Sequence, residues 1–220
     1  MSTFYRDHHR VLQDRFDTRR LADKIEALAM KGEIEEQDKA FIESRDMFWL
    51  STVDDQGQPT VSYKGGEPGF VKVVDHTTLA FPSYDGNGMF YSVGNMTNHA
   101  KIGMLFMDFE RPFRLRVHGT ATVSDAGADI GLFKEAQLVV RVAVEQVFIN
   151  CPRYVHRYQK VQGSRYAPRP DVATPMAGWK RIDMIQDDLP ASDKGRAEKE
   201  GGLITIDDWF EKLGRGDVEA

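Results

Sequence analysis

Cysteine is nearly absent from this sequence of 220 residues, in which Cys151 stands alone. An internal disulfide and a metal site made of clustered cysteines both need at least two thiols, so both are excluded. Long apolar runs are lacking too, because none approaches the roughly 20 residues that cross a bilayer. The charged residues 1–10 also lack the apolar segment of a secretory signal. We therefore expect a cytoplasmic protein that does not associate with a membrane.

A surplus of positive charge is also lacking. The sequence has 29 Lys and Arg residues against 34 Asp and Glu residues, which gives a net charge of −5. Nucleic-acid binding requires a basic face, so we expect no nucleic-acid partner. The six histidines include no pair at ligand spacing on one element, and we expect no metal site.

What the sequence does contain is a series of short β-type segments between turn residues. They predict strands at residues 47–53, 59–63, 70–74, 79–81, 102–107, 114–123 and 139–149. Helical spacing predicts helices over residues 8–31, 35–44 and 205–213, and a short one over residues 129–136. Six or so of these short strands, in near-sequential order, predict a mainly β protein, a six-stranded antiparallel β-barrel with flanking helices. We expect a single domain of residues 1–220, with helices at 8–44, the barrel at about 45–157 and an extension at 158–220.

The segment of residues 78–98 is the most informative. A strand at residues 79–81 is expected to break at Pro82, and Asp85-Gly-Asn-Gly88 favours a turn with positive φ. Beyond Gly88 the apolar residues follow helical spacing. A strand, a glycine-rich turn and a helix start form a good anion site, because unpaired backbone N–H groups face the same point. Tyr91 stands where a dinucleotide fingerprint needs its third glycine, and an ordinary loop that caps a helix remains an open alternative.

With these strands placed, the sequence resembles the pyridoxamine 5′-phosphate oxidase-like, FMN-binding split-barrel family over roughly residues 40–157. The residues that carry this resemblance are Phe48-Trp-Leu-Ser-Thr-Val53, Gly57-x-Pro59, Val61-Ser-Tyr-Lys-Gly-Gly66, Pro68-Gly-Phe70, Leu79-Ala-Phe-Pro82, Gly86-Asn-Gly88, Gly94-Asn95, Asn98, Leu105-Phe106, Arg114-Leu-Arg-Val-x-Gly119 and Phe148-Ile-Asn-Cys-Pro-Arg-Tyr154. Their order and spacing together are more specific than any single motif.

The resemblance implies a homodimer of split barrels with two FMN molecules at the interface. It implies that a strand lining the flavin carries the lysine that binds the phosphate, that the glycine-rich loop contributes to the same site, and that Arg114 reaches the isoalloxazine edge. The expected cofactor-binding residues are Ser62, Tyr63, Lys64, Pro82, Asn87, Gly88, Met89, Ser92 and Arg114.

The sequence departs from that family in two places. Phe90 and Tyr91 stand where a close vitamin B6 oxidase carries an arginine-lysine pair, so the phosphate would rely on Lys64, backbone amides and Ser92. The C-terminal substrate segment of that oxidase is also missing. Pyridoxamine phosphate is therefore not the substrate that we expect.

Several residues allow a plainer interpretation. Lys64 is alternatively a lone surface lysine, and Arg114 and Arg116, on one face of an alternating strand, alternatively serve solubility. Cys151 and His156 form a candidate nucleophile and base, although a buried inert thiol is the better interpretation. The aromatic residues that we expect in the core are Trp49, Phe81, Phe90 and Phe106, with the alternative that one of them borders the flavin ring.

Two classes of function follow. The first is a flavin-dependent oxidoreductase, in which FMN transfers a hydride through N5 to or from an unidentified small molecule, with NAD(P)H as a candidate donor. The second is a flavin-binding protein without turnover, which acts as a sensor, store or stress-related protein. A relative that binds a deazaflavin or haem is a further alternative. No catalytic residue is assigned.

Overall fold

The computed structural model describes residue 2, residues 4–127 and residues 129–220. The chain divides into two compact units, Met1–Gln159 and Lys160–Ala220. The second unit corresponds closely to the segment that the sequence analysis treats as an extension, and each unit is described by itself.

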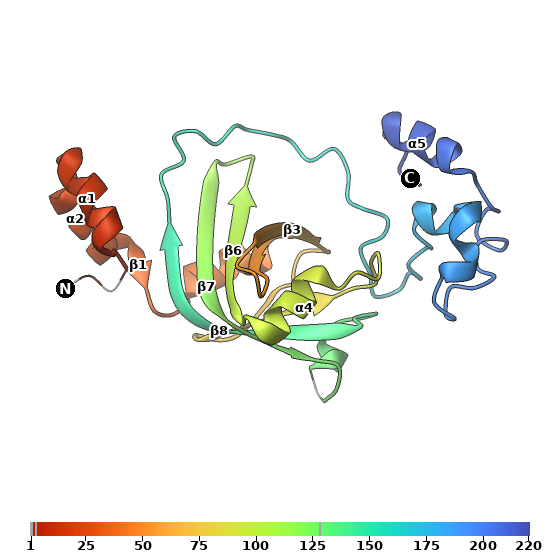
Figure 1. The fold of residues 1–220 in the computed structure, drawn as a ribbon, viewed down its shortest axis with the longest axis horizontal. Coiled ribbons are helices and arrows are strands. Elements are labelled where there is room, and N and C mark those ends of the chain that lie inside the picture. Colours follow the sequence, from red (N-terminus) through yellow and green to blue (C-terminus); the bar gives the residue numbers. More distant parts are fainter. Residues whose placement is uncertain (1, 3, 128) are drawn as a thin grey trace. The chain divides into compact units, whose positions relative to one another are not determined.

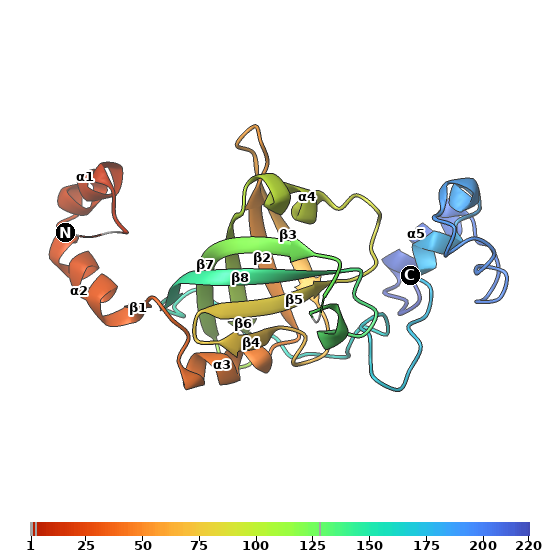
Figure 2. The same ribbon diagram turned by 90° about the horizontal axis from the view of Figure 1, so that it is seen from below.

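The first unit is built on one antiparallel sheet that curls around the core (Figures 1 and 2). Its path runs in the order β3-β2-β6-β7-β8-β5-β4, and β1 pairs with β8 beside this path. The strands are β1 (Met30–Lys31), β2 (Met47–Val53), β3 (Pro59–Gly65), β4 (Lys72–Asp75), β5 (Thr78–Ser83), β6 (Lys101–Asp108), β7 (Phe113–Ser124) and β8 (Leu138–Ile149). The mainly β class is therefore confirmed, with eight strands in place of six.

The core lies on one face of this sheet because side chains alternate along each strand. In β2, Phe48, Leu50 and Thr52 are buried while the residues that alternate with them are half-buried. The ring of Phe48 packs against Phe81 and Phe106, with centroids 5.1 and 5.3 Å away. Phe81 and Phe106 are thus core residues, as expected. Trp49 is only half-buried and Phe90 is exposed, so for these two aromatics the prediction was wrong.

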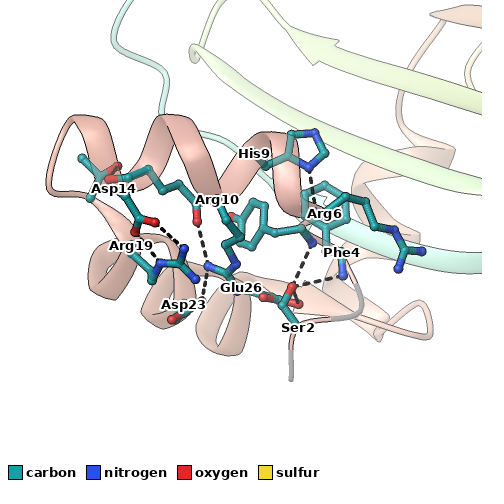
Figure 3. A network of polar contacts seen from close by, with 12 residues as sticks. Ser2, Phe4, Arg6, His9, Arg10, Asp14, Arg19, Asp23 and Glu26 are labelled. Atoms are coloured by element: carbon teal, nitrogen blue, oxygen red, sulfur yellow. Dashed lines mark hydrogen bonds and ion pairs between the residues drawn. The ribbon is translucent and has the colours of Figure 1, made fainter.

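The helix expected over residues 8–31 is two helices, α1 (Asp7–Arg15) and α2 (Arg19–Ala29). The break falls at Asp17, whose φ of 52° is incompatible with a continuing right-handed helix. Arg10 holds the two helices together through Asp23, at 2.6 Å. Figure 3 shows this network, in which Ser2 also donates to Glu26. The apolar side chains of the hairpin remain exposed: Val11, Leu12, Phe16, Leu21, Ile25 and Leu28.

Helix α3 (Glu36–Glu43) and helix α4 (Tyr91–Asn98) flank the sheet. Pro82 does not break its strand, because β5 continues to Ser83 and Pro82 pairs with Val139 of β8. The pairing of β5 with β4 ends at Ala80. Pro82 lies beyond it, so β4 does not need the N–H group that proline lacks. The connection after β5 includes Gly88 at φ 75° before α4 begins.

Two further details concern β7 and the segment that follows it. The register with β8 shifts between His118 and Gly119, which confirms the irregularity expected at this glycine. A Cβ on Gly119 would lie 2.4 Å from the carbonyl oxygen of Ala143, so only glycine fits. The helix expected at residues 129–136 is a single 3₁₀ turn, η1 (Ile130–Leu132).

The unit of residues Lys160–Ala220 contains the 3₁₀ helices η2 (Gly178–Arg181) and η3 (Asp183–Asp188) and the helix α5 (Ile206–Gly214). Thr205 caps α5 as expected, since its side chain accepts from the amide of Asp208. Across the part of the chain that the structure describes, no helix has the length and apolarity that a bilayer crossing requires.

Candidate functional site

Strand β3, at one edge of the sheet, has an unusual distribution of polar residues. Ser62 and Lys64 pair with Leu50 and Phe48 of β2, which are fully buried. Residues directly opposite in an antiparallel pair point to the same side, so Ser62 and Lys64 point inward. Tyr63 lies between them and points outward, with 63% of its surface exposed. The inner side of this edge strand is therefore polar.

Lys64 is the most distinctive residue on this inner side. Its side chain is half-buried, and no described residue forms a hydrogen bond or ion pair with it. Burial lowers the pKa of Lys64, because the charged form loses hydration without gaining a counter-charge. An inward-pointing lysine on an edge strand also discourages pairing with another sheet, which is the plain structural interpretation. A partly desolvated ammonium group is equally suited to bind an anion.

The start of α4 lies beside Ser62. The Ser62 and Ser92 hydroxyl oxygens are 2.7 Å apart, and Ser92 is buried in the first turn of α4. The Asn95 side-chain amide donates to the Thr52 hydroxyl at 3.1 Å, which holds the helix against β2. The first N–H groups of a helix have no partner within it and carry partial positive charge. Two hydroxyl groups and a helix N-terminus thus come together on the face of β3 that carries Lys64, about 7 Å along the strand from it.

The other loop residues named from the sequence are placed differently. Asn87, Gly88 and Met89 are exposed, and the Asn87 side-chain oxygen accepts from the Met89 amide at 3.1 Å. Pro82 is buried within β5. Among the cofactor-binding residues predicted from the sequence, Ser62 and Ser92 are therefore in direct contact with each other.

Arg114 lies on the opposite, outward face of the sheet. It precedes Leu115, which is fully buried, and it pairs with Met107 of β6. Its Nη2 group donates to the carbonyl oxygen of Cys151 at 2.9 Å, while its Nε group is buried and has no acceptor. Since β7 lies three strands from β3, about 14 Å separates the two strands.

Asn150 is a candidate residue that sequence reasoning missed. It follows β8 and precedes Cys151, to which Arg114 donates, so it lies at the same corner of the sheet. Its side-chain oxygen is buried and accepts no hydrogen bond. A donor and an acceptor, both without partners, therefore lie near one another. The sequence contains Asn150 within a family motif but does not indicate that its side-chain oxygen is unpaired.

The other candidate residues from the sequence give weaker evidence for a functional site. Cys151 is exposed, so the expectation of a buried thiol was wrong, and no hydrogen bond joins it to His156 among the described residues. Nowhere in the described ranges do three or more His, Cys, Asp or Glu side chains gather as a metal site would require. On the outward face, the ring of Trp49 packs against Phe109 at 6.0 Å, and Phe109 packs against Tyr158 at 5.3 Å.

Several solved structures are similar to part of this chain. A single-residue variant of HupZ from Group A Streptococcus is 26% identical, with a TM-score of 0.44 over 53% of this chain and 99% of its own. A pyridoxamine 5′-phosphate oxidase homologue from Lactobacillus delbrueckii is 24% identical, with a TM-score of 0.44 over 54% and 95%. An FMN-binding protein from Syntrophomonas wolfei is 10% identical, with a TM-score of 0.44 over 64% and 97%. No curated protein matches the chain.

The family comparison is decisive. The model of the pyridoxamine 5′-phosphate oxidase family matches residues 34–165, which is more than half of the chain and contains the whole sheet from β2 to β8. The antiparallel sheet with flanking helices is accordingly the split β-barrel that the sequence resemblance implies. The chain belongs to the pyridoxamine 5′-phosphate oxidase family.

Proposed function

We propose that this protein binds FMN and uses it as an oxidoreductase that acts on a small molecule. The observation that carries the proposal is Lys64, a half-buried cation without a partner among the described residues, next to the Ser62–Ser92 pair. This arrangement supports a phosphate site. The ammonium group supplies charge, the hydroxyl groups donate hydrogen bonds, and the first amides of α4 have no partner within the helix.

Arg114 and Asn150 support a second contact, to the ring system of the flavin. The unpaired Nε of Arg114 is a donor and the unpaired side-chain oxygen of Asn150 is an acceptor. The pyrimidine part of a flavin presents carbonyl oxygens and an N–H group on one edge, which need these two partners. A guanidinium group at this edge also stabilises negative charge on the reduced ring. When bound, FMN supplies hydride transfer at N5, and the chain's residues bind, orient and tune it.

The two sets of residues lie on opposite faces of the sheet in one chain, and this supports a homodimer. We propose that Lys64 and Arg114 of one chain serve two different FMN molecules, with a second copy completing each site. The outer side of β3 is apolar and exposed at Val61 and Tyr63, by 66% and 63%. An apolar outer face on an edge strand is a suitable surface for a twofold interface.

The test of cofactor binding compares FMN with riboflavin, which lacks the phosphate. We expect purified protein to carry about one FMN per chain and to quench the fluorescence of added FMN. Lys64→Ala should weaken FMN by about tenfold to a hundredfold, because a charge-assisted hydrogen bond is lost. Riboflavin binding should change far less. The control is Lys101→Ala, which removes a lysine whose side chain is 73% exposed on the same sheet.

Specific results would contradict this proposal. Colourless protein that leaves FMN fluorescence unchanged rules out FMN as the ligand, and a haem or deazaflavin spectrum would identify the cofactor as another one. Equal losses for FMN and riboflavin in Lys64→Ala would remove Lys64 from the phosphate site. Bleaching of the flavin absorbance by NADH or NADPH, followed by reoxidation by a small molecule, separates an oxidoreductase from a flavin-binding protein without turnover.

Assembly is tested by sedimentation of apoprotein and FMN-loaded protein over a dilution series. We expect FMN to favour the dimer and to raise its melting temperature, since a ligand stabilises the state that binds it. A stable monomer that binds FMN without associating would place the whole site within one chain.

A further inference from the structure

Arg116 is the second arginine on the outward face of β7. It lies between Leu105 of β6 and Phe148 of β8, its partners in the ladder. No described residue forms a hydrogen bond or ion pair with its guanidinium group. Burial lowers the pKa of Arg116, and the nearby charge of Arg114 lowers it further. Two cations thus lie close together, and Arg116 has no counter-charge from the described part of the chain.

The carboxylates of neighbouring segments are engaged elsewhere. Glu145 of β8 binds Lys101 and the hydroxyl of Thr120. Asp108, at the end of β6, binds Arg45 at 3.2 Å and accepts from the amides of residues 110 and 111. The charge on Arg116 is therefore not neutralised by either acid. A half-buried guanidinium group without a counter-charge loses part of its hydration, so an anion that binds beside it is favoured.

The contact with Phe148 explains how Arg116 is oriented. The guanidinium carbon lies 5.9 Å from the centre of the Phe148 ring, near the outer limit of a cation–π contact. A guanidinium group that stacks on a ring leaves the N–H groups at its edge available to another partner. That edge matches the two oxygens of a carboxylate or phosphate. Solubility alone would favour a fully hydrated side chain and would not need this position.

We propose that Arg116 binds the anionic group, a carboxylate or phosphate, of the small molecule that reacts with the flavin. The proposal rests on the proposed function. Arg114 lies two residues away on the same face, at about 7 Å along the strand. A ligand anion at Arg116 would accordingly lie beside the ring edge assigned to Arg114.

The experiment measures the binding of inorganic phosphate and of benzoate by calorimetry, with the full chain in its FMN-loaded and apo forms. Shifts in the flavin absorbance provide a second readout in the loaded form. We expect at least one of the two anions to bind saturably, whereas chloride at equal ionic strength does not bind in this way. Arg116→Met should weaken that binding about tenfold or more. Arg116→Lys should restore part of it, because it keeps the charge and loses the two-pronged geometry.

Arg111→Met is the matched control, since it makes the same change at a side chain that is 86% exposed. It should leave anion binding unchanged, and melting curves of each variant report whether the fold is intact. Preference for phosphate or for benzoate identifies the chemistry of the ligand anion.

Three results would overturn the proposal: no saturable anion binding by the wild-type protein, equal binding by Arg116→Met, or loss of FMN from Arg116→Met, which would assign Arg116 to the cofactor. If the protein binds no FMN but binds anions through Arg116, the proposed function fails and the anion site remains, now without a flavin beside it.

Discussion

In the barrel, the largest fully buried side chains are apolar, among them Phe48, Phe81 and Phe106. In the unit of residues Lys160–Ala220, the buried apolar cluster consists of Met176, Leu189 and Ala197. That unit also buries an ion pair, Lys180 with Asp193, at 2.6 Å and with 3% and 6% of the side chains exposed. The barrel thus depends mainly on the hydrophobic effect, whereas the second unit depends on charges that must remain paired.

The charged residues of the second unit form a connected chain. Asp193 binds Lys180 and Arg196, and Arg196 also binds Glu200. Glu200 in turn accepts from the amide of Met176 at 2.7 Å. A network of this kind fixes which segments meet, but each member becomes costly when its partner is removed. The comparison between the units is therefore testable by removing single charges.

The largest effect is expected from Asp193→Ala. This change removes the Asp193 carboxylate from the buried Lys180 ammonium group and should destabilise the second unit by about 3–5 kcal/mol. Hydrogen exchange measured on peptides should show loss of protection over residues 176–204 and little change in β2, β6 and β7. The control is Asp171→Ala, at an exposed position in the same unit.

A double variant sharpens this prediction. Lys180→Met combined with Asp193→Leu replaces the ion pair with apolar side chains, and it should recover much of the lost stability because both charges of the buried pair are removed together. Equal loss of protection in the barrel after Asp193→Ala would show that the second unit does not depend on this ion pair more than the barrel does.

Acid should affect the second unit through Glu200. Burial alone would raise the pKa of Glu200, but the hydrogen bond from Met176 and the charge of Arg196 outweigh it, so this pKa is lowered. The pKa of Glu200 is lower in the folded state than in the unfolded state, where it is about 4.3. The ionised carboxylate therefore stabilises the fold at pH values above about 4.3, and this stability is lost as the pH falls through the folded-state pKa. The indole N–H signals of Trp179 and Trp209 in NMR spectra should therefore change as pH falls below about 4.

The matching variant is Glu200→Gln, which should flatten this acid dependence and lower stability at neutral pH. Trp49 lies in the barrel and reports on the other unit. If the Trp49 signal changed at a higher pH than the signals of Trp179 and Trp209, the barrel would be the more acid-sensitive unit. That result would contradict the prediction that acid destabilises the second unit first.

The same contrast explains what could be predicted from the sequence. The β2–β3 hairpin follows from alternation and from its turn, in which Asp54 accepts from the amides of Gln56 and Gln58. The second unit has no such periodicity. It is held by pairs of residues that are separated in sequence, such as Lys180 with Asp193 and Ile182 with Ile204, and a local pattern does not predict such pairs. The sequence therefore indicated only an extension there, although the capped helix α5 was correctly predicted.

In the candidate site, too, local sequence patterns were predictable and contacts between distant residues were not. The alternation of β3 by itself predicts that Ser62 and Lys64 share one face of the strand. Sequence alone could not reveal that Lys64 and Arg116 lack partners among the described residues, because that depends on which carboxylates reach them in space. The unpaired oxygen of Asn150 is likewise a property of the folded chain.

The smallest effect is expected at the start of α5, where local sequence decides the structure. Thr205 accepts from the amide of Asp208 at 3.1 Å and donates to its carboxylate at 2.7 Å. Thr205→Ala removes both contacts and should cost about 1 kcal/mol, the usual value of an N-cap residue. Thr205→Ser keeps the hydroxyl group and should cost little. Faster hydrogen exchange confined to residues 206–214 is the expected result, since a cap stabilises only its own helix. Because the buried ion pair lies elsewhere in the unit, faster exchange that spread to residues 176–200 would show instead that α5 and the ionic network unfold together.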